Sequence, residues 1–263
     1  MSAKINAPSP CDDVLLVTSA LQPPNGIPFV QMRSVNDRWH QTLCALVSWI
    51  RDTSIRRIVF CDNSAANCSF DAIRKFAQSF GKEIEVVIFQ GDIEKLCSYG
   101  KGYGEGEIVA HAFANSQFLR QARSFYKITG RIFIGNFEDL HRRHAKDPVV
   151  FSLPGVPWKN RFKQYLLRFE RVRRQFEGRS AYTVFYKSSM SFFRTHLLER
   201  YLEVDERQNR WLEHVYFLPV MLNGAVGFRK RLMVVGLRGT SGETYEGHTY
   251  PDDVVALAWS LAA

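Results

Sequence analysis

A run of alternating glycines is the first segment whose residue types can do chemistry. In residues 99–107 every second position from Gly100 to Gly106 is glycine, and Lys101 stands between the first two. Uncovered backbone N–H groups ahead of a helix bind anions, and a neighbouring lysine strengthens that attraction. The spacing matches neither a Walker A motif nor a Rossmann GxGxxG, and a flexible turn is the alternative. We expect an anion-binding glycine loop ahead of a helix that begins near Glu107.

Two basic residues flank the end of an apolar run in residues 127–131, KITGR. A lysine and an arginine at such a place are costly to bury without an anionic partner. Arginine binds phosphate groups with two parallel hydrogen bonds, so Lys127 and Arg131 together suit a diphosphate. The alternative is that Arg131 pairs with a structural carboxylate, which is an ordinary arrangement.

The elements that must position these residues alternate between strands and helices. Apolar runs predict strands, and apolar residues at helical spacing predict helices. The expected strands are 14–17, 57–61, 84–89 and 125–128, and the expected helices between them are 39–50, 70–80 and 107–122. This alternation predicts an α/β fold with a mostly parallel central sheet and helices on both faces.

Four polar or glycine-rich segments follow the expected strands. They are residues 18–24, 62–64, the glycine run and 129–131. In parallel sheets ligands bind at the carboxyl ends of the strands. We therefore expect the four segments to converge on one site.

The second half of the sequence is less regular but shows no repeat and no linker, so we expect a single domain. Its expected helices are 158–179, 192–202 and 211–222, and its expected strands are 182–186 and 232–235. The first helix sets an apolar stripe against eight basic residues, which suits an anionic membrane surface or a lipid-linked diphosphate. A core-facing helix with a solvated basic side explains the same pattern.

Composition limits the class of protein and its partners. Hydrophobic residues make up 46% of the 263 residues, enough for a packed core, and the net charge of +9 favours anionic partners. Five cysteines without a CxxC pair indicate a reducing compartment, with neither disulfides nor thiolate zinc. Residues 1–10 lack a signal-peptide core, and no apolar stretch approaches the roughly 20 residues of a membrane span. We expect a cytoplasmic protein, and no nucleic-acid partner because no known nucleic-acid module is present.

Several segments together resemble bacterial glycosyltransferases of surface-polysaccharide loci, in the GT-A (nucleotide-diphospho-sugar transferase) group. The resemblance is carried by VTSALQPP at 17–24, FCDNS at 60–64, GKGYGEGE at 100–107 and FYKITGR at 125–131. It continues at 204–207 and 211–217, so it spans most of the chain.

The resemblance implies a GT-A-like single domain over 1–263. Within it, 1–12 is a flexible leader, 13–140 a nucleotide-sugar-binding half and 141–263 an acceptor-side half. The implied enzyme moves a sugar from a nucleotide-sugar donor to a glycan or lipid-linked acceptor, in lipopolysaccharide or capsule synthesis. It would be cytoplasmic, or peripheral on the inner face of the cell membrane.

The resemblance also implies the residues that bind the donor. They are Thr18, Asp62, Asn63, Lys101, Gly102, Gly104, Glu105, Lys127, Thr129 and Arg131. Many GT-A enzymes carry an Asp-x-Asp metal motif where this chain has residues 127–131, and here the acidic pair is missing. Lysine and arginine can neutralise a leaving diphosphate as a bound cation does. We therefore expect no required cofactor and no divalent metal.

An inverting transfer needs a side chain that accepts the proton of the acceptor hydroxyl. Candidates are Asp205, Glu206, Glu213 and His214. Glu213 lies in an aromatic-rich helical stretch, where burial raises the pKa of a carboxylate towards the range of a working base. We favour Glu213, although a helix-surface glutamate beside a core histidine fits the same pattern. In a retaining enzyme this assignment would not apply.

Two other functions fit parts of the sequence. A basic nucleic-acid- or membrane-binding module would use the glycine segment only structurally, and a sugar nucleotidyltransferase could use a similar sheet. A second glycine- and hydroxyl-rich segment, 236–245, fits phosphate contact through Arg238, Thr240 and Ser241, or a plain turn. His248 stands alone in a loop and is weak support for a ligand site.

Overall fold

The computed structural model describes residues 11–24, 32, 34–154, 179–237, 243–245 and 247–262 of the chain. The basic helix expected over 158–179 lies outside these residues except for Arg179, and the loop at 236–245 lies outside them at 238–242. Of the leader expected at 1–12, only Cys11 and Asp12 are described, and both belong to the first strand rather than to a loose segment.

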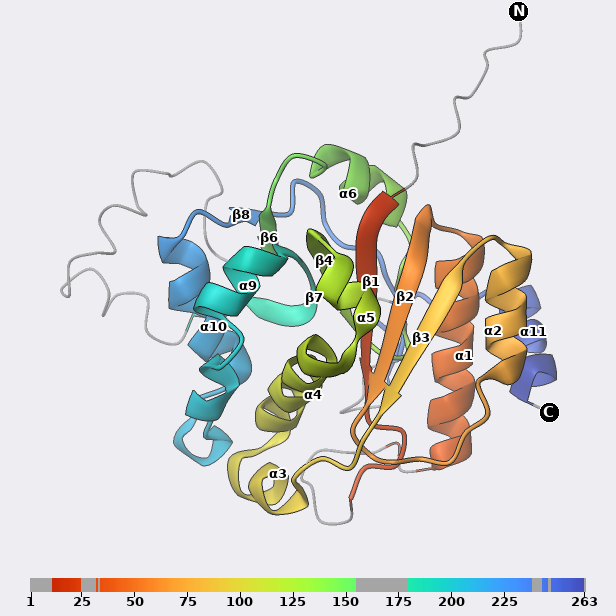
Figure 1. Cartoon of the computed structure of the whole chain (residues 1–263), viewed down its shortest axis with the longest axis horizontal. Helices are drawn as coiled ribbons and strands as arrows, with labels where there is room; N and C mark the ends of the chain where they lie inside the picture. The colour runs from red at the N-terminus through yellow and green to blue at the C-terminus, as the bar shows by residue number, and fades with distance from the viewer. Residues whose placement is uncertain are drawn as a thin grey trace, which may run out of the picture.

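Within the described residues, seven strands form a sheet in the order β3-β2-β1-β4-β7-β6-β8 (Figure 1). Their bounds are β1 Cys11–Ser19, β2 Ile55–Asp62, β3 Glu83–Ile88, β4 Ser124–Thr129, β6 Val149–Ser152, β7 Tyr182–Ser189 and β8 Val226–Gly227. Strands β3, β2, β1 and β4 are parallel, β7 is antiparallel to both of its neighbours, and β8 is parallel to β6. The expected α/β fold with a mostly parallel central sheet is confirmed. A separate antiparallel pair joins β5 (Ile132–Ile134) to β9 (Val234–Gly236).

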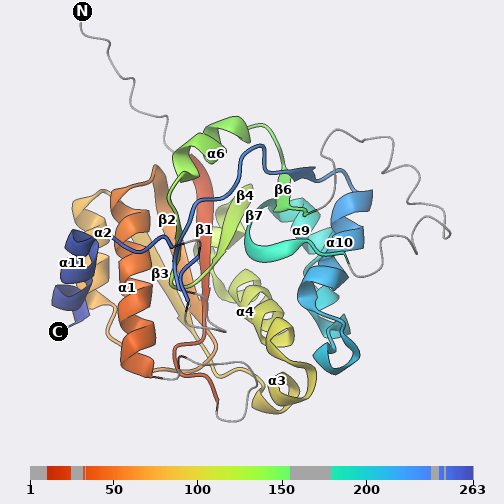
Figure 2. The same ribbon diagram turned by 180° about the vertical axis from the view of Figure 1, so that it is seen from behind.

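Helices cover both faces of the sheet (Figures 1 and 2). The bounds are α1 Val35–Arg51, α2 Asp71–Ser79, α3 Ile93–Tyr99, α4 Lys101–Asn115, α5 Gln117–Gln121, α6 Phe137–Arg143, α9 Met190–His196, α10 Leu212–Leu222 and α11 Asp252–Ala262, with 3₁₀ turns at Arg200–Glu203 and Glu206–Gln208. Helices α1, α2 and α11 lie on one face, and α4, α9 and α10 lie on the other. In the described ranges, no helix combines the length and apolar character needed to cross a membrane.

Strand β1 is buried on both faces. Leu15 and Val17 belong to the apolar cluster that includes α1, whereas Val14 and Leu16 belong to the cluster that includes α4. Successive side chains of a strand point to opposite faces, so a strand between two helix layers needs apolar residues throughout. This explains the uninterrupted apolar run in the sequence.

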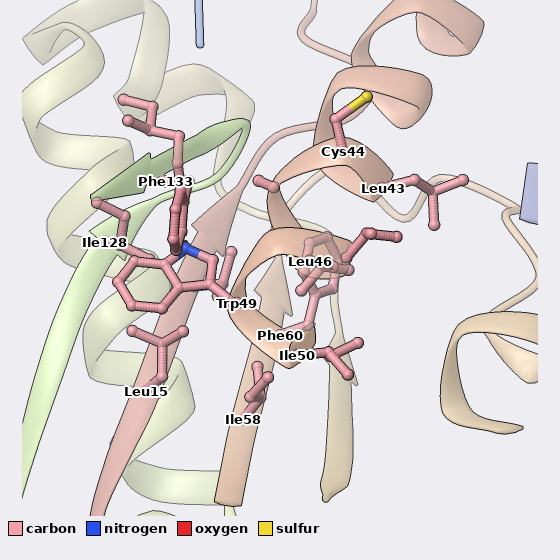
Figure 3. Close-up of a cluster of buried hydrophobic side chains, with 14 of the residues drawn as sticks. Leu15, Leu43, Cys44, Leu46, Trp49, Ile50, Ile58, Phe60, Ile128 and Phe133 are labelled. Carbon is pink, nitrogen blue, oxygen red and sulfur yellow. Dashed lines mark hydrogen bonds between the residues drawn. The ribbon is translucent and has the colours of Figure 1, made fainter. Parts of the chain in front are cut away.

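Helix α1 is anchored to the sheet by Trp49, which has no exposed surface. Its Nε1 donates to the carbonyl of Ile132 over 3.0 Å, and its ring stands edge-on to Phe133 with centroids 5.1 Å apart. Figure 3 shows the indole between Phe133 and Leu15 of β1.

Helix α1 begins at the carboxyl edge of the sheet, where Arg38 donates to the carbonyl of Ala20 just after β1.

The expectation of a glycine loop over residues 100–106 is wrong, because α4 begins at Lys101 and takes in three of the glycines. Gly100 joins α3 to α4 with φ +101°, a conformation that strongly favours glycine. A Cβ on Gly102 would lie 3.1 Å from the backbone nitrogen of Leu212, so the helix packs closely against the start of α10. The glycines therefore allow neighbouring segments to pack closely against α4. The sequence did not indicate this role, because glycine has a low helix propensity and the run resembles a loop.

Replacing Gly106 with alanine is expected to destabilise the protein by about 1–3 kcal/mol. A Cβ at this position would overlap Cβ and Cγ of Tyr201, atoms close to the backbone that cannot move aside easily. This strain exceeds the gain of about 1 kcal/mol that alanine ordinarily brings to a helix. Urea unfolding of both proteins measures the difference.

Gly104→Ala is the matched control for that substitution. Its added Cβ would lie 2.8 Å from Cδ1 of Leu96, the far end of a flexible side chain that can shift. We expect Gly104→Ala to stay within about 0.5 kcal/mol of the native protein. Equal free energies of unfolding for the two variants would contradict the packing argument.

Candidate functional site

A cavity of about 370 Å³ lies at the carboxyl ends of β1 and β4. All four segments expected to converge contribute to its lining, namely 18–24, 62–64, the start of α4 and 129–131. Lys101 and Arg131 both line it, on elements that are far apart in sequence. A larger hollow of about 760 Å³, bounded by α6 and residues 247–251, includes none of the expected donor-binding or catalytic residues but does include His248.

The cavity gathers ten of the fourteen donor-binding residues and base candidates named from the sequence. These are Thr18, Asn63, Lys101, Gly102, Gly104, Glu105, Thr129, Arg131, Glu206 and Glu213. Residues that the sequence did not single out also line it, among them Ser19, Arg38, Thr183, Trp211 and Tyr245. Asp62, Lys127, Asp205 and His214 do not line it, and each has another structural role.

Arg131 is held at the cavity by an unusual backbone. Its φ is +72°, and the preceding Gly130 donates its N–H to the carbonyl of Thr18 over 2.6 Å. The carbonyl of Arg131 accepts from the hydroxyl of Tyr250 over 2.9 Å. A left-handed conformation at a non-glycine residue costs free energy and persists only where its surroundings enforce it. These contacts fix the residue as it leaves β4.

Glu213 occupies the first turn of α10 and is partly buried. Its Oε1 accepts from the hydroxyl of Thr183 over 3.2 Å. Burial raises the pKa of Glu213, and the charge of Glu105 raises it further. A carboxylate in this environment takes up a proton more readily than one in water, which suits a general base.

Glu206 borders the cavity and was only an alternative base in the sequence. Its Oε1 accepts from the backbone N–H of Gly102 over 2.7 Å, which satisfies one of the amide groups at the start of α4. Burial raises the pKa of Glu206, whereas this hydrogen bond and the charge of Lys101 lower it. The N-terminus of α4 is therefore already partly capped by a carboxylate, so its amides are not all available to an anion.

Lys127 was expected to grip the donor phosphates, and the structure places it elsewhere. Its side chain is only 1% exposed, and Nζ forms an ion pair with Glu105. Nζ also donates to Thr129 Oγ1 over 3.0 Å and to the carbonyl of Thr183 over 2.8 Å. A buried ammonium needs such partners. Lys127 thus lies behind the cavity wall and holds Glu105, which does line the cavity.

The other three displaced candidates organise turns. Asp62 is fully buried, and its carboxylate accepts from the N–H groups of Leu21 and Ser64 over 2.7 and 2.8 Å, which ties together the loops after β1 and β2. Asp205 caps the 3₁₀ turn Glu206–Gln208. Nδ1 of His214 lies 2.9 Å from the carbonyl oxygen of Asn209. Short polar side chains next to strands and turns bond the local backbone, and sequence alone does not separate that use from ligand binding.

The Lys127–Glu105 ion pair leads to a prediction that its two residues contribute unequally to the free energy of unfolding. Glu105→Gln is expected to destabilise the protein by about 3 kcal/mol, because it leaves the buried ammonium of Lys127 without its counter-charge. Lys127→Met is expected to cost less, since the Glu105 side chain is 26% exposed and can be solvated. Urea unfolding of each variant measures both free energies.

The double variant Glu105→Gln/Lys127→Met supplies the control. It removes both charges, so its stability is expected to exceed that of Glu105→Gln alone. Additive losses in the double variant would show that the two side chains do not interact.

A divalent-metal site built from protein side chains alone needs several acidic, histidine or cysteine ligands in one place. In the part of the chain that the structure describes, no three such side chains are gathered in that way. The described residues thus offer no metal site that is complete without a bound nucleotide, and we assign no catalytic step to a metal ion.

The sequence matches no protein-family model and no curated protein. Solved structures do resemble it. The glycosyltransferase GlyE of Streptococcus pneumoniae is 7% identical with a TM-score of 0.50, and the match covers 82% of this chain and 45% of GlyE. Core-mannan synthase A from Aspergillus fumigatus is 11% identical with a TM-score of 0.45, over 98% of this chain and 84% of that one. Galactosyltransferase LgtC, solved with donor and acceptor sugar analogs, is 9% identical with a TM-score of 0.47, over 81% and 72%.

At such low identities the likeness concerns the fold, and it confirms the GT-A-like fold that the resemblance implied. One expectation is overturned. The core-mannan synthase structure is a Mn/GDP form, so a protein that resembles this chain binds manganese with its nucleotide. This contradicts the expectation that no divalent metal is required. The missing Asp-x-Asp motif was not a sufficient basis for it.

Proposed function

We propose that this protein is a glycosyltransferase that moves a sugar from a nucleotide-sugar donor to a hydroxyl group of a glycan or glycolipid acceptor. The observation that carries the proposal is the cavity itself, because a buried arginine and a carboxylate of raised pKa both line it at the carboxyl edge of a GT-A-like sheet. A departing diphosphate needs a cation, and an attacking hydroxyl needs a base. The cavity holds both.

The reaction assigns one role to each group. Glu213 accepts the proton of the acceptor hydroxyl while that oxygen attacks the anomeric carbon, with inversion of configuration. The bond from the anomeric carbon to the diphosphate breaks, and its electron pair leaves with the diphosphate. Arg131 and Lys101 stabilise the negative charge that develops there. Glu213 then releases its proton to water.

The remaining cavity residues are proposed to bind the donor. Thr18 and Asn63, at the ends of β1 and β2, line the cavity, and we assign them to the nucleoside. Thr129, Gly102, Gly104 and Glu105 also line it, and we assign them to the diphosphate and the sugar. Polar side chains at the carboxyl ends of parallel strands are the usual place for nucleotide binding in sheets of this kind.

For the biological setting we propose synthesis of a bacterial surface polysaccharide, either lipopolysaccharide or capsule. The support is the resemblance of segments 17–24, 60–64, 100–107 and 125–131 to enzymes of such loci. The basic segment 158–179 would bring the protein to an anionic membrane where a lipid-linked acceptor is found.

Thermal unfolding with a panel of UDP-, GDP-, dTDP- and CMP-linked sugars tests the proposal. A ligand that binds the native state raises the unfolding temperature, and one nucleotide class is expected to do so. With that donor, Mn²⁺ or Mg²⁺ and an acceptor extract, the protein should release the free nucleotide and label the acceptor. Release of pyrophosphate would indicate a nucleotidyltransferase instead. No response to any nucleotide, with salt-sensitive binding to DNA or RNA, would overturn the proposal.

A further inference from the structure

Two buried guanidinium groups line the same cavity. Arg131 follows β4 and is 8% exposed, and Arg38, in the first turns of α1, is 7% exposed. Arg38 is fixed by two backbone acceptors, since Nε donates to the carbonyl of Ala20 over 2.7 Å and Nη1 to that of Met32 over 2.9 Å. The residue therefore has a defined position on the cavity wall.

Neither arginine forms an ion pair with a carboxylate among the described residues. The acceptors of Arg38 are neutral carbonyls, and the contact of Arg131 Nη1 at 3.8 Å is the thioether of Met32. Asp62 raises the pKa of Arg38 by its charge, but no hydrogen bond or ion pair joins the two side chains, and the carboxylate accepts from the N–H groups of Leu21 and Ser64. Two positive charges are thus buried together without a bonded counter-charge, which is unfavourable unless an anion joins them.

The electrostatics of the pair point the same way. Burial lowers the pKa of Arg38 to about 9, and the charge of Arg131 adds to that effect. Burial also lowers the pKa of Arg131. An anion placed between the two groups would reverse both shifts, since an opposite charge favours the protonated guanidinium.

Hydrogen-bond donors remain available for such an anion. Arg38 gives two of its five N–H groups to the described backbone, and no described residue accepts from the other three. A planar guanidinium binds phosphate oxygens through two parallel hydrogen bonds. Two such groups match the charge and the several oxygens of a diphosphate better than those of a single phosphate.

We propose that Arg38 and Arg131 form a two-arginine clamp for a diphosphate group, in which Arg38 is a binding residue that the motifs did not reveal. The inference rests on the proposed function, which places the donor diphosphate in this cavity. It also orients the donor. With the diphosphate at the clamp, the sugar extends towards the part of the cavity lined by Glu105 and Glu213.

Calorimetric titration with inorganic pyrophosphate tests the clamp without any sugar. The native protein is expected to bind pyrophosphate at least tenfold more tightly than inorganic phosphate. Arg38→Met is expected to weaken pyrophosphate binding by about 10- to 100-fold. Arg120→Met, which removes an exposed arginine and the same net charge, should change it less than twofold. Equal affinity in native and Arg38→Met proteins would overturn the proposal.

Arg38→Lys keeps the test decisive if the methionine variant does not fold. Lysine retains the charge but loses the planar fork, so we expect a loss of about five- to tenfold with the native preference for pyrophosphate reduced. Unchanged affinity in this variant would equally overturn the clamp.

Two further experiments identify the molecule that supplies the diphosphate and distinguish failure of the clamp from failure of the proposed function. Nucleoside diphosphates are expected to compete with pyrophosphate more strongly than a soluble prenyl diphosphate does, and the reverse order would assign the clamp to a lipid-linked acceptor. Pyrophosphate binding that depends on Arg38, without any glycosyl transfer, would keep the clamp and refute the proposed function. Transfer by Arg38→Met with the native KM for the donor would do the opposite.

Discussion

Replacing Arg131 with glutamine is expected to lower kcat/KM for glycosyl transfer by about 100- to 1000-fold. The guanidinium is buried at the cavity where the donor diphosphate is proposed to leave, and glutamine keeps a side chain of hydrogen-bonding character without the charge. Glutamine at a φ of +72° bears about the same backbone strain as arginine, so the substitution changes the charge and little else. Steady-state kinetics with the donor found by thermal unfolding measures the effect.

The unfolding temperature of Arg131→Gln shows whether lost activity comes from the missing charge or from a failure to fold. The native cation is buried without a bonded carboxylate among the described residues, so removing it should leave the unfolding temperature of the ligand-free protein unchanged or higher. The rise in unfolding temperature that the donor causes in the native protein should be absent. Arg120→Gln, at an exposed position, should keep native kinetics. Full transfer activity in Arg131→Gln would refute the phosphate role.

The sequence predicted the convergence at the cavity correctly because that feature follows from topology. An uninterrupted apolar run such as 14–17 indicates a strand buried on both faces, and strands separated by helices pair in parallel. Once the strands are parallel, the segments that follow them must meet at one edge. Segments 18–24 and 129–131 meet there, joined by the hydrogen bond from Gly130 to Thr18. No side-chain detail was needed for this step.

The side-chain roles at the site depend on contacts that sequence spacing does not encode. Lys127 was assigned to the ligand, but it forms an ion pair with Glu105, which lies 22 residues away on another element. Arg38 was overlooked because an arginine in the first turns of an amphipathic helix ordinarily faces solvent. One signal was available, since a helix that follows β1 begins at the carboxyl edge of the sheet. Its early residues therefore belong to the same rim as the strand-end segments.

The glycines of α4 show a conflict between local and tertiary preference. Alternating glycines disfavour a helix by about 1 kcal/mol each, so the local pattern predicts a loop. Close approach of Leu212 and Tyr201 to Gly102 and Gly106 requires residues without a Cβ, and packing of the surrounding segments stabilises the helix. The short elements β5 and α6 were not predicted for a different reason, because segments of three and seven residues carry too little periodicity to be recognised.

Glu213→Gln is expected to lower kcat by about 100- to 10,000-fold, the usual contribution of a general base, with a smaller change in the KM for the donor. In the native protein the rate should rise with pH as Glu213 loses its proton, and this rise should lie above the ordinary range of a glutamate because burial raises its pKa. Glutamine has no proton to lose at this position, so the residual rate of the variant should not show this rise with pH. Rates measured across the acid range test both expectations.

The stability of the same variant should change in the opposite direction to its activity. The pKa of Glu213 is higher in the folded protein than in the unfolded chain. Its stabilising contribution is therefore complete below the unfolded pKa of about 4.3 and is lost as the pH rises through the folded pKa. At neutral pH, glutamine should then match or exceed the native unfolding temperature, and the advantage should vanish in acid. Glu199→Gln, at an exposed position, should alter neither quantity. A Glu213→Gln protein that unfolds earlier and keeps the native pH profile would make this carboxylate a structural group, and the acceptor proton would need another base.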